Sequence, residues 1–131
     1  MMYMDAGIAF DTVFGDGSGG GGGLFGKLLG AGKRLVTGEA LSPASRAQLT
    51  EWMVGCKTGA NRLRGGLPAS WKIGDKTGNN GKDASGDIAV AWPKPDTPIL
   101  IAAYTQGGTP NAAQIEAAFA GIGRMVTERL A

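Results

Sequence analysis

Lys76, Thr77 and Gly78 form a short run that is well suited to bind an anion. A lysine supplies a positive charge and three N–H donors, and a threonine hydroxyl can hydrogen-bond an anionic oxygen. Gly78 has no side chain, so a ligand can lie against the strand backbone there. The next main-chain N–H, that of Asn79, can point at a developing oxyanion. The run therefore predicts a carboxylate-binding site at a strand end. By itself, it is also typical of the end of an ordinary β-hairpin.

The composition excludes several common kinds of site. The chain has no histidine and one cysteine, Cys56. This rules out the usual zinc and iron sites, Ser-His and Cys-His pairs and an intrachain disulfide, so we predict no metal and no cofactor. We expect Cys56 to be a small, partly buried side chain. The formal net charge is +2 and the basic residues are scattered, which argues against a nucleic-acid partner.

The sequence also gives no sign of a membrane partner. No apolar run approaches the roughly 20 residues that a membrane span needs. The first residues lack the basic start and long apolar core of a signal peptide, and they carry Asp5 and Asp11 instead. We therefore expect the chain, expressed as written, to stay in the cytoplasm.

A glycine run divides the chain into three parts. Residues 17–23, GSGGGGG, have the composition of a flexible linker. The head, residues 1–16, contains one predicted strand, AGIAFDTVF. An isolated strand is unstable, so we expect this one to join a sheet beside residues 98–106. Residues 24–131 form the main domain, which is large enough for one modest core.

Two helices are predicted early in the main domain. The apolar spacing of residues 24–39 is helical, although three glycines interrupt it. The next segment, residues 41–55, begins with Ser42 as an N-cap and Pro43 at the first helical position. Its apolar residues Leu49, Trp52 and Met53 fall on one face. We expect Trp52 and Trp71 to pack in or near the core. A short helical turn is predicted around residues 60–64.

Three strands and a long helix complete the predicted fold. The strands are residues 71–77, 87–92 and 98–106, and the turn-rich segments between them indicate an antiparallel meander. The C-terminal segment places an apolar stripe on one side of an amphipathic helix. That stripe contains Ile115, Phe119, Ile122, Val126 and Leu130. We therefore predict an α+β fold with an antiparallel sheet of three to four or more strands and the C-terminal helix on one face.

Several longer strings around the Lys-Thr-Gly run carry a family resemblance. These strings are LSPASRAQLTEWMVG, KTGANRLRGGLPASWKIGDKTG, GDIAVAWP and the closing helix. With them, the chain resembles the C-terminal portion of a class A serine β-lactamase from about Lys33 to Ala131, and the head resembles the family's first strand more weakly. Lys-Thr-Gly is a motif of these penicillin-recognising enzymes.

The resemblance implies roles for particular residues. Lys76 and Thr77 would bind the carboxylate of a β-lactam, and the N–H of Asn79 would be one half of the oxyanion hole. Arg62 matches an arginine that supports carboxylate binding in one branch of the family, while its spacing alone equally fits a solvated surface charge. Asp87 matches an aspartate for which a structural role is expected. Family members act in the periplasm or outside the cell.

The family's catalytic motifs do not occur in the 131 residues. There is no Ser-x-x-Lys, no Ser-Asp-Asn and no glutamate followed four residues later by asparagine. The resemblance therefore implies a truncated or engineered domain that binds β-lactams weakly and has no independent turnover. Exposed apolar surface would then favour self-association or pairing with a complementing fragment. The alternative is a functional β-lactam hydrolase, alone or as one half of a complemented enzyme, and hydrolysis by this chain alone would need Ser85, Thr77 or Ser70 as the nucleophile.

Overall fold

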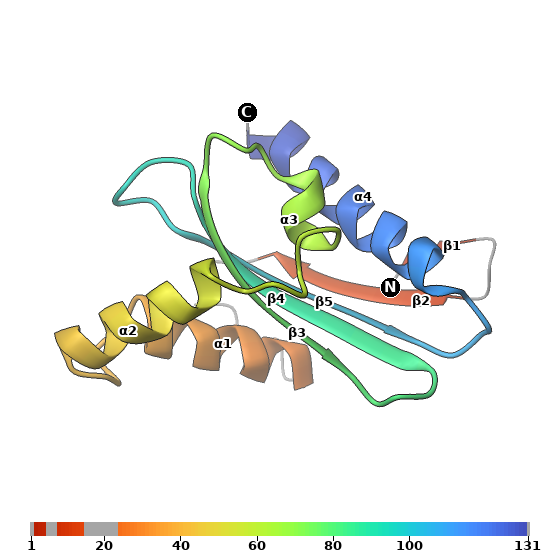
Figure 1. Cartoon of the computed structure of the whole chain (residues 1–131), viewed down its shortest axis with the longest axis horizontal. Coiled ribbons are helices and arrows are strands. Elements are labelled where there is room, and N and C mark those ends of the chain that lie inside the picture. The colour runs from red at the N-terminus through yellow and green to blue at the C-terminus, as the bar shows by residue number, and fades with distance from the viewer. Residues whose placement is uncertain (1, 5–7, 15–23, 131) are drawn as a thin grey trace.

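The chain folds as an α+β domain built on one five-stranded antiparallel sheet (Figure 1). The computed structural model describes the backbone of residues 2–4, 8–14 and 24–130 and the side chains of residues 30–130. The strand order is β1-β2-β5-β4-β3. The elements are β1 (Met2–Met4), β2 (Ile8–Phe14), α1 (Leu24–Val36), α2 (Pro43–Val54), α3 (Leu63–Gly66), β3 (Lys72–Asn79), β4 (Ala84–Trp92), β5 (Ile99–Gln106) and α4 (Ala112–Leu130).

The head joins the sheet as predicted. Strand β2 pairs antiparallel with β5, from Ala9 opposite Gln106 to Phe14 opposite Ile101. The head also contains a second, shorter strand, β1, which pairs with β2. The sequence did not predict this strand. The predicted linker, residues 17–23, lies outside the described residues.

The meander of β3, β4 and β5 is confirmed, and the boundary that moves most is the start of β4. Strand β4 begins at Ala84, whereas the sequence predicted a start at Asp87. The reason lies in the turn, where the Asn80 side-chain oxygen accepts the N–H groups of Lys82, Asp83 and Ala84 at 2.9–3.0 Å. This side chain closes the loop within a few residues, so strand pairing resumes early.

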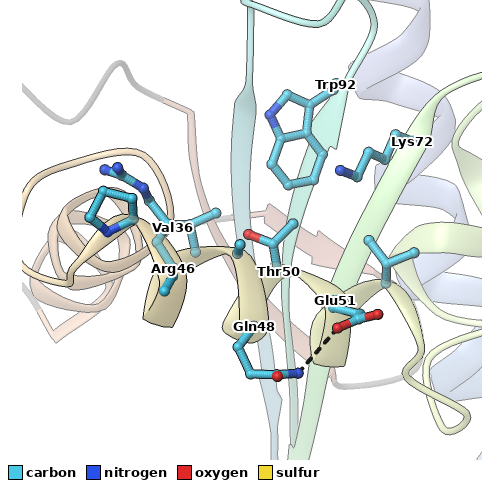
Figure 2. A pocket seen from close by; sticks show the side chains of 11 residues that line it. Val36, Arg46, Gln48, Thr50, Glu51, Lys72 and Trp92 are labelled. Carbon is cyan, nitrogen blue, oxygen red and sulfur yellow. Dashed lines mark hydrogen bonds between the residues drawn. The ribbon is translucent and has the colours of Figure 1, made fainter.

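Helices α1 and α2 lie on one side of the sheet (Figure 1). Helix α1 confirms the predicted helix and approaches β5 closely at Gly32, where an added Cβ would lie 3.3 Å from Leu100 Cδ2. Helix α2 begins as predicted, because the Ser42 side chain accepts the N–H of Ser45 at 3.2 Å. Trp92 of β4 and Lys72 of β3 lie beside each other above α2 (Figure 2).

Burial along α2 differs from the prediction. None of its residues is buried, and Trp52 is 69% exposed, so the expectation that Trp52 packs in the core is wrong. The helix meets the sheet through Met53, whose Cβ would lie 2.9 Å from a Cβ added at Gly74. This contact turns Trp52 toward solvent. Trp71 is partly buried against the core, as expected.

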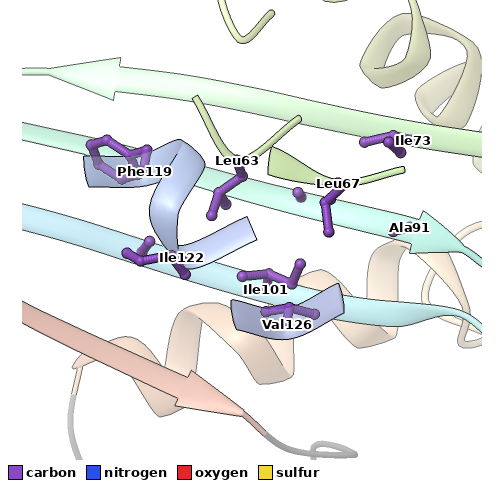
Figure 3. Packing of buried hydrophobic residues seen from close by; sticks show 10 residues of the cluster. Leu63, Leu67, Ile73, Ala91, Ile101, Phe119, Ile122 and Val126 are labelled. Carbon is purple, nitrogen blue, oxygen red and sulfur yellow. The ribbon is translucent and has the colours of Figure 1, made fainter. Parts of the chain in front are cut away.

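The hydrophobic core lies on the other side of the sheet, under α3 and α4 (Figure 3). Phe119, Ile122 and Val126 of α4 are buried there, and Ile115 packs against the cluster. These four positions confirm the predicted stripe. Leu130 is 55% exposed, so its predicted place in the stripe is wrong. It lies at the end of α4, beyond the last helix residue that belongs to the cluster.

None of the helices in the described part of the chain is long and apolar enough to cross a membrane.

Candidate functional site

The predicted carboxylate site lies on β3, which is the last strand in the order of the described sheet. Asn80 donates its N–H to the carbonyl of Ala84 at 3.1 Å across the hairpin. In an antiparallel pair, the main-chain groups of alternate residues point toward the partner strand and the others point away. The main-chain groups of Thr77 and Asn79 therefore point to the outer edge of β3. A ligand at that edge can reach the N–H of Asn79.

The side chains of Lys76 and Thr77 point to opposite faces of the sheet. Ile73 belongs to the core under α4, whereas Gly74 faces Met53 of α2. Because side chains alternate along a strand, Lys76 extends on the α2 side and Thr77 on the α4 side. The two side chains can contact one ligand only at the strand edge, where both faces are accessible.

The Lys76 ammonium group is held at this edge. Its Nζ donates to the carbonyl oxygen of Thr77 at 2.6 Å, and the residue is exposed. The ammonium group has further N–H donors available to an incoming anion.

The Thr77 hydroxyl has a partner that the sequence did not predict. Thr77 Oγ1 lies 2.6 Å from Thr58 Oγ1, and Thr58 Oγ1 lies 3.5 Å from the Cys56 sulfur. The half-exposed Cys56 agrees with the prediction of a partly buried side chain. Thr58 is separated from Thr77 by 19 residues, and no local spacing pattern links the two positions.

Arg62 contacts the strand through its guanidinium group. Its Nη1 donates to the carbonyls of Gly86 at 2.7 Å and Gly78 at 3.3 Å, and its Cζ lies 5.5 Å from the centroid of the Phe119 ring. These contacts place Arg62 against β3 and β4, so it is not the solvated surface charge that its spacing also allowed. They fix the backbone of the hairpin next to Lys76.

A cavity of about 450 Å³ opens beside the Lys76 end of β3, and we call it the Lys76 cavity. Four of the five predicted site residues line it: Lys76, Thr77, Gly78 and Asn79. Arg62 does not line it. Its apolar surface comes from the neighbouring strands, through Ile88, Ala102 and Tyr104. The cavity thus combines a cation at the strand edge with an apolar wall.

Behind the site, two buried aspartates flank an arginine. Asp75 is fully buried and forms an ion pair with Arg64, whose Nε donates to Asp75 Oδ1 at 2.8 Å. Arg64 also donates to the carbonyls of Met53 and Val54, at 3.1 Å each. This arginine therefore links the end of α2 to the strand that carries Lys76.

Asp87 is the second buried aspartate, with 2% of its surface exposed. Its Oδ2 accepts the N–H of Leu63 at 3.1 Å, which fits the structural role that the resemblance implied. Its Oδ1 and Asp75 Oδ2 are both buried and have no hydrogen-bond partner among the described residues. Burial, reinforced by the negative charge of Asp75, raises the pKa of Asp87 from its ordinary value of 3.8 to about 7, although the Leu63 N–H, Arg62 and Arg64 act in the opposite direction.

The described residues offer little for nucleophilic or metal chemistry. Ser85 is buried, Thr77 shares a hydrogen bond with Thr58, and Ser70 is exposed. Because the chain has no histidine, none of the three can be paired with the usual general base. The described part of the chain contains no cluster of three or more residues that could hold a metal ion.

Comparison with known proteins places these features in context. Residues 27–130 match a family model described as the β-lactamase enzyme family. β-Lactamase L2 of Stenotrophomonas maltophilia is 43% identical over 99 residues, which are 75% of this chain and 32% of that protein. β-Lactamase CTX-M-25 of Escherichia coli is 40% identical over 96 residues, or 73% of this chain and 33% of that protein.

A solved structure of an ancestral class A β-lactamase is similar as well. It is 44% identical to this chain, with a TM-score of 0.76, and the alignment covers 80% of this chain and 40% of that one. The chain thus spans about a third of the length of the curated relatives it matches.

Proposed function

Because the chain belongs to the β-lactamase enzyme family, we propose that its Lys76 cavity binds the carboxylate of β-lactam antibiotics and that this chain alone does not hydrolyse them. The observation that carries the proposal is the position of the Lys76 ammonium group, at a strand edge beside a cavity of about 450 Å³. Ligand pockets of drug-sized molecules have volumes of about 300–1,000 Å³.

The arrangement suits an anion with an apolar body. A β-lactam carboxylate at the edge of β3 would accept hydrogen bonds from Lys76 Nζ and from the Thr77 hydroxyl. The Asn79 N–H, pointing to the same edge, would face the lactam carbonyl. The apolar wall formed by Ile88, Ala102 and Tyr104 would cover part of the remaining ligand.

The absence of turnover is expected from the chemistry that acyl transfer requires. Hydrolysis through a covalent intermediate needs an activated nucleophile. The 131 residues contain neither the Ser-x-x-Lys nor the Ser-Asp-Asn motif. Without the nucleophile, only binding and oxyanion contributions remain. Loss of one oxyanion donor alone reduces the rate of an otherwise complete enzyme by about 10²–10³.

Intact-mass spectrometry after incubation with excess penicillin tests whether any residue of this chain is acylated. We expect no adduct, because no activated hydroxyl of the described residues lines the Lys76 cavity. An adduct with the mass of the drug would show that some residue is acylated, and it would overturn this part of the proposal.

Binding is tested by NMR titration with penicillin. We expect an affinity of millimolar at best, or roughly −4 kcal/mol. The Lys76→Ala variant should lose this binding, while Lys57→Ala, which removes another exposed lysine, should keep it. Equal binding by both variants would exclude the Lys76 cavity as the site.

A second candidate function is that of one half of a complemented enzyme. It is favoured by α2, which has no buried residue and in which Trp52 is 69% exposed. Exposed apolar surface of this kind is typical of a protein-interaction site. The test compares nitrocefin hydrolysis by this chain alone with hydrolysis by a mixture. The mixture contains this chain and the part of CTX-M-25 that this chain does not match. Hydrolysis only in the mixture would support complementation, and no hydrolysis in either sample would contradict it.

A further inference from the structure

A second cavity lies on the same side of the sheet, between α2 and the opposite end of β3 (Figure 2). Its volume is about 720 Å³, and we call it the Lys72 cavity. We propose that it binds a small carboxylate carried on a flat aromatic body, at a site distinct from the Lys76 cavity. Lys72 and Lys76 extend on the same side of β3, four residues apart, which corresponds to about 13 Å along a strand.

The cation of this site is positioned by an aromatic ring. Lys72 and Trp92 are register partners on β3 and β4, and Lys72 Nζ lies 5.0 Å from the centroid of the Trp92 ring. Among the described residues, no carboxylate forms an ion pair with Lys72, since the one such pair joins Arg64 and Asp75. The ring orients the ammonium group without neutralising it, so its N–H donors are available to an anion.

Apolar side chains form part of the cavity wall. The Trp92 ring points from β4 toward α2, as Figure 2 shows, and it is partly buried. Val36, Val54 and Ala47 line the cavity from α1 and α2. An indole ring is large and flat, and it offers a stacking surface to a planar ligand. The volume falls within the range of about 300–1,000 Å³ that is typical of small-molecule pockets.

The charges at the rim favour an anion over a cation. Arg46 lines the cavity, and its Nη1 donates to the carbonyl of Gly38, which anchors the guanidinium group. Glu51 also lines it, and its Oε2 accepts a hydrogen bond from Gln48 Nε2 at 3.2 Å. The cavity therefore carries the cations Lys72 and Arg46 against one carboxylate. A ligand with a single carboxylate on an aromatic ring can balance the excess positive charge and stack its ring on the indole.

The site can be tested on the intact chain by NMR with 2-naphthoate as the probe and 2-naphthamide as its neutral counterpart. We expect 2-naphthoate to shift the indole N–H signal of Trp92 in a saturable way, and 2-naphthamide to bind about tenfold more weakly because it lacks the charge. Lys72→Gln should weaken 2-naphthoate binding by about the same factor. The matched control Lys94→Gln, at another exposed lysine outside the cavity, should bind as the unchanged chain does.

Three results would overturn the proposal. One is the absence of a saturable shift up to about 10 mM probe, which means no site of useful affinity. Another is binding that Lys76→Ala abolishes and Lys72→Gln leaves unchanged, because the probe would then occupy the Lys76 cavity. The third is unchanged binding in Ala47→Leu. That substitution adds bulk at an exposed position in the cavity wall and should block the probe while the fold is retained.

Discussion

Replacing Asp87 by asparagine should make the fold more stable at neutral and alkaline pH and should remove most of a pH dependence. Asp87 is 2% exposed, and its buried Oδ1 has no hydrogen-bond partner in the part of the chain that the structure describes. An ionised carboxylate at this position loses its hydration and lies near the charge of Asp75. Asparagine has the same shape and no charge, and its side-chain oxygen can still accept the N–H of Leu63.

The size of the effect follows from the shift in the pKa of Asp87, from 3.8 to about 7. Three pKa units correspond to about 4 kcal/mol. Because the pKa is raised in the folded state, the folded chain binds this proton more tightly than the unfolded chain does. The stabilisation that this bound proton gives the folded chain is fully present below about pH 4, decreases as the pH rises through 7, and is absent above it.

Urea unfolding at several pH values between 4 and 8 measures this difference. The free energy of unfolding of Asp87→Asn minus that of the unchanged chain should be larger at pH 8 than at pH 4, by up to about 4 kcal/mol. Asp96→Asn, which removes an exposed aspartate from the loop between β4 and β5, should show no such trend. The reasoning is refuted if the difference between Asp87→Asn and the unchanged chain does not depend on pH.

Four further substitutions test the packing. Gly66→Ala would place a Cβ 1.9 Å from the Ala120 carbonyl oxygen, so it should cost about 1–3 kcal/mol or more by urea unfolding, whereas Gly78→Ala meets nothing within 4 Å and should be tolerated. Phe119→Ala removes a fully buried ring and should cost about 3–5 kcal/mol; a loss below about 1 kcal/mol would contradict the assigned core. Trp52→Gln should change the free energy of unfolding by less than about 0.5 kcal/mol, because Trp52 is 69% exposed, and a large loss would show that it packs against something.

The local elements of this fold could be predicted because their signals lie within a few residues of one another. Ser42 and Pro43 mark the start of α2, and the apolar runs of β4 and β5 identify them as strands. The Lys-Thr-Gly run likewise identified the strand end beside which the structure places a cavity. In each case the signal is a capping side chain, a periodicity or a short motif, and each of these acts over one or two turns of chain.

The amino-acid sequence revealed only some of the side chains that become buried, because burial also depends on segments far apart in the chain. Trp52 and Met53 are neighbours on α2, yet only Met53 packs on Gly74, since the position of the helix over β3 decides which one faces the sheet. The partnership of Thr58 with Thr77 spans 19 residues. The raised pKa of Asp87 arises from burial and from the charge of Asp75, with the Leu63 N–H of α3 acting in the opposite direction. Local pattern thus determined the elements and the candidate lysine, whereas tertiary packing decided which groups meet and which charges are removed from water.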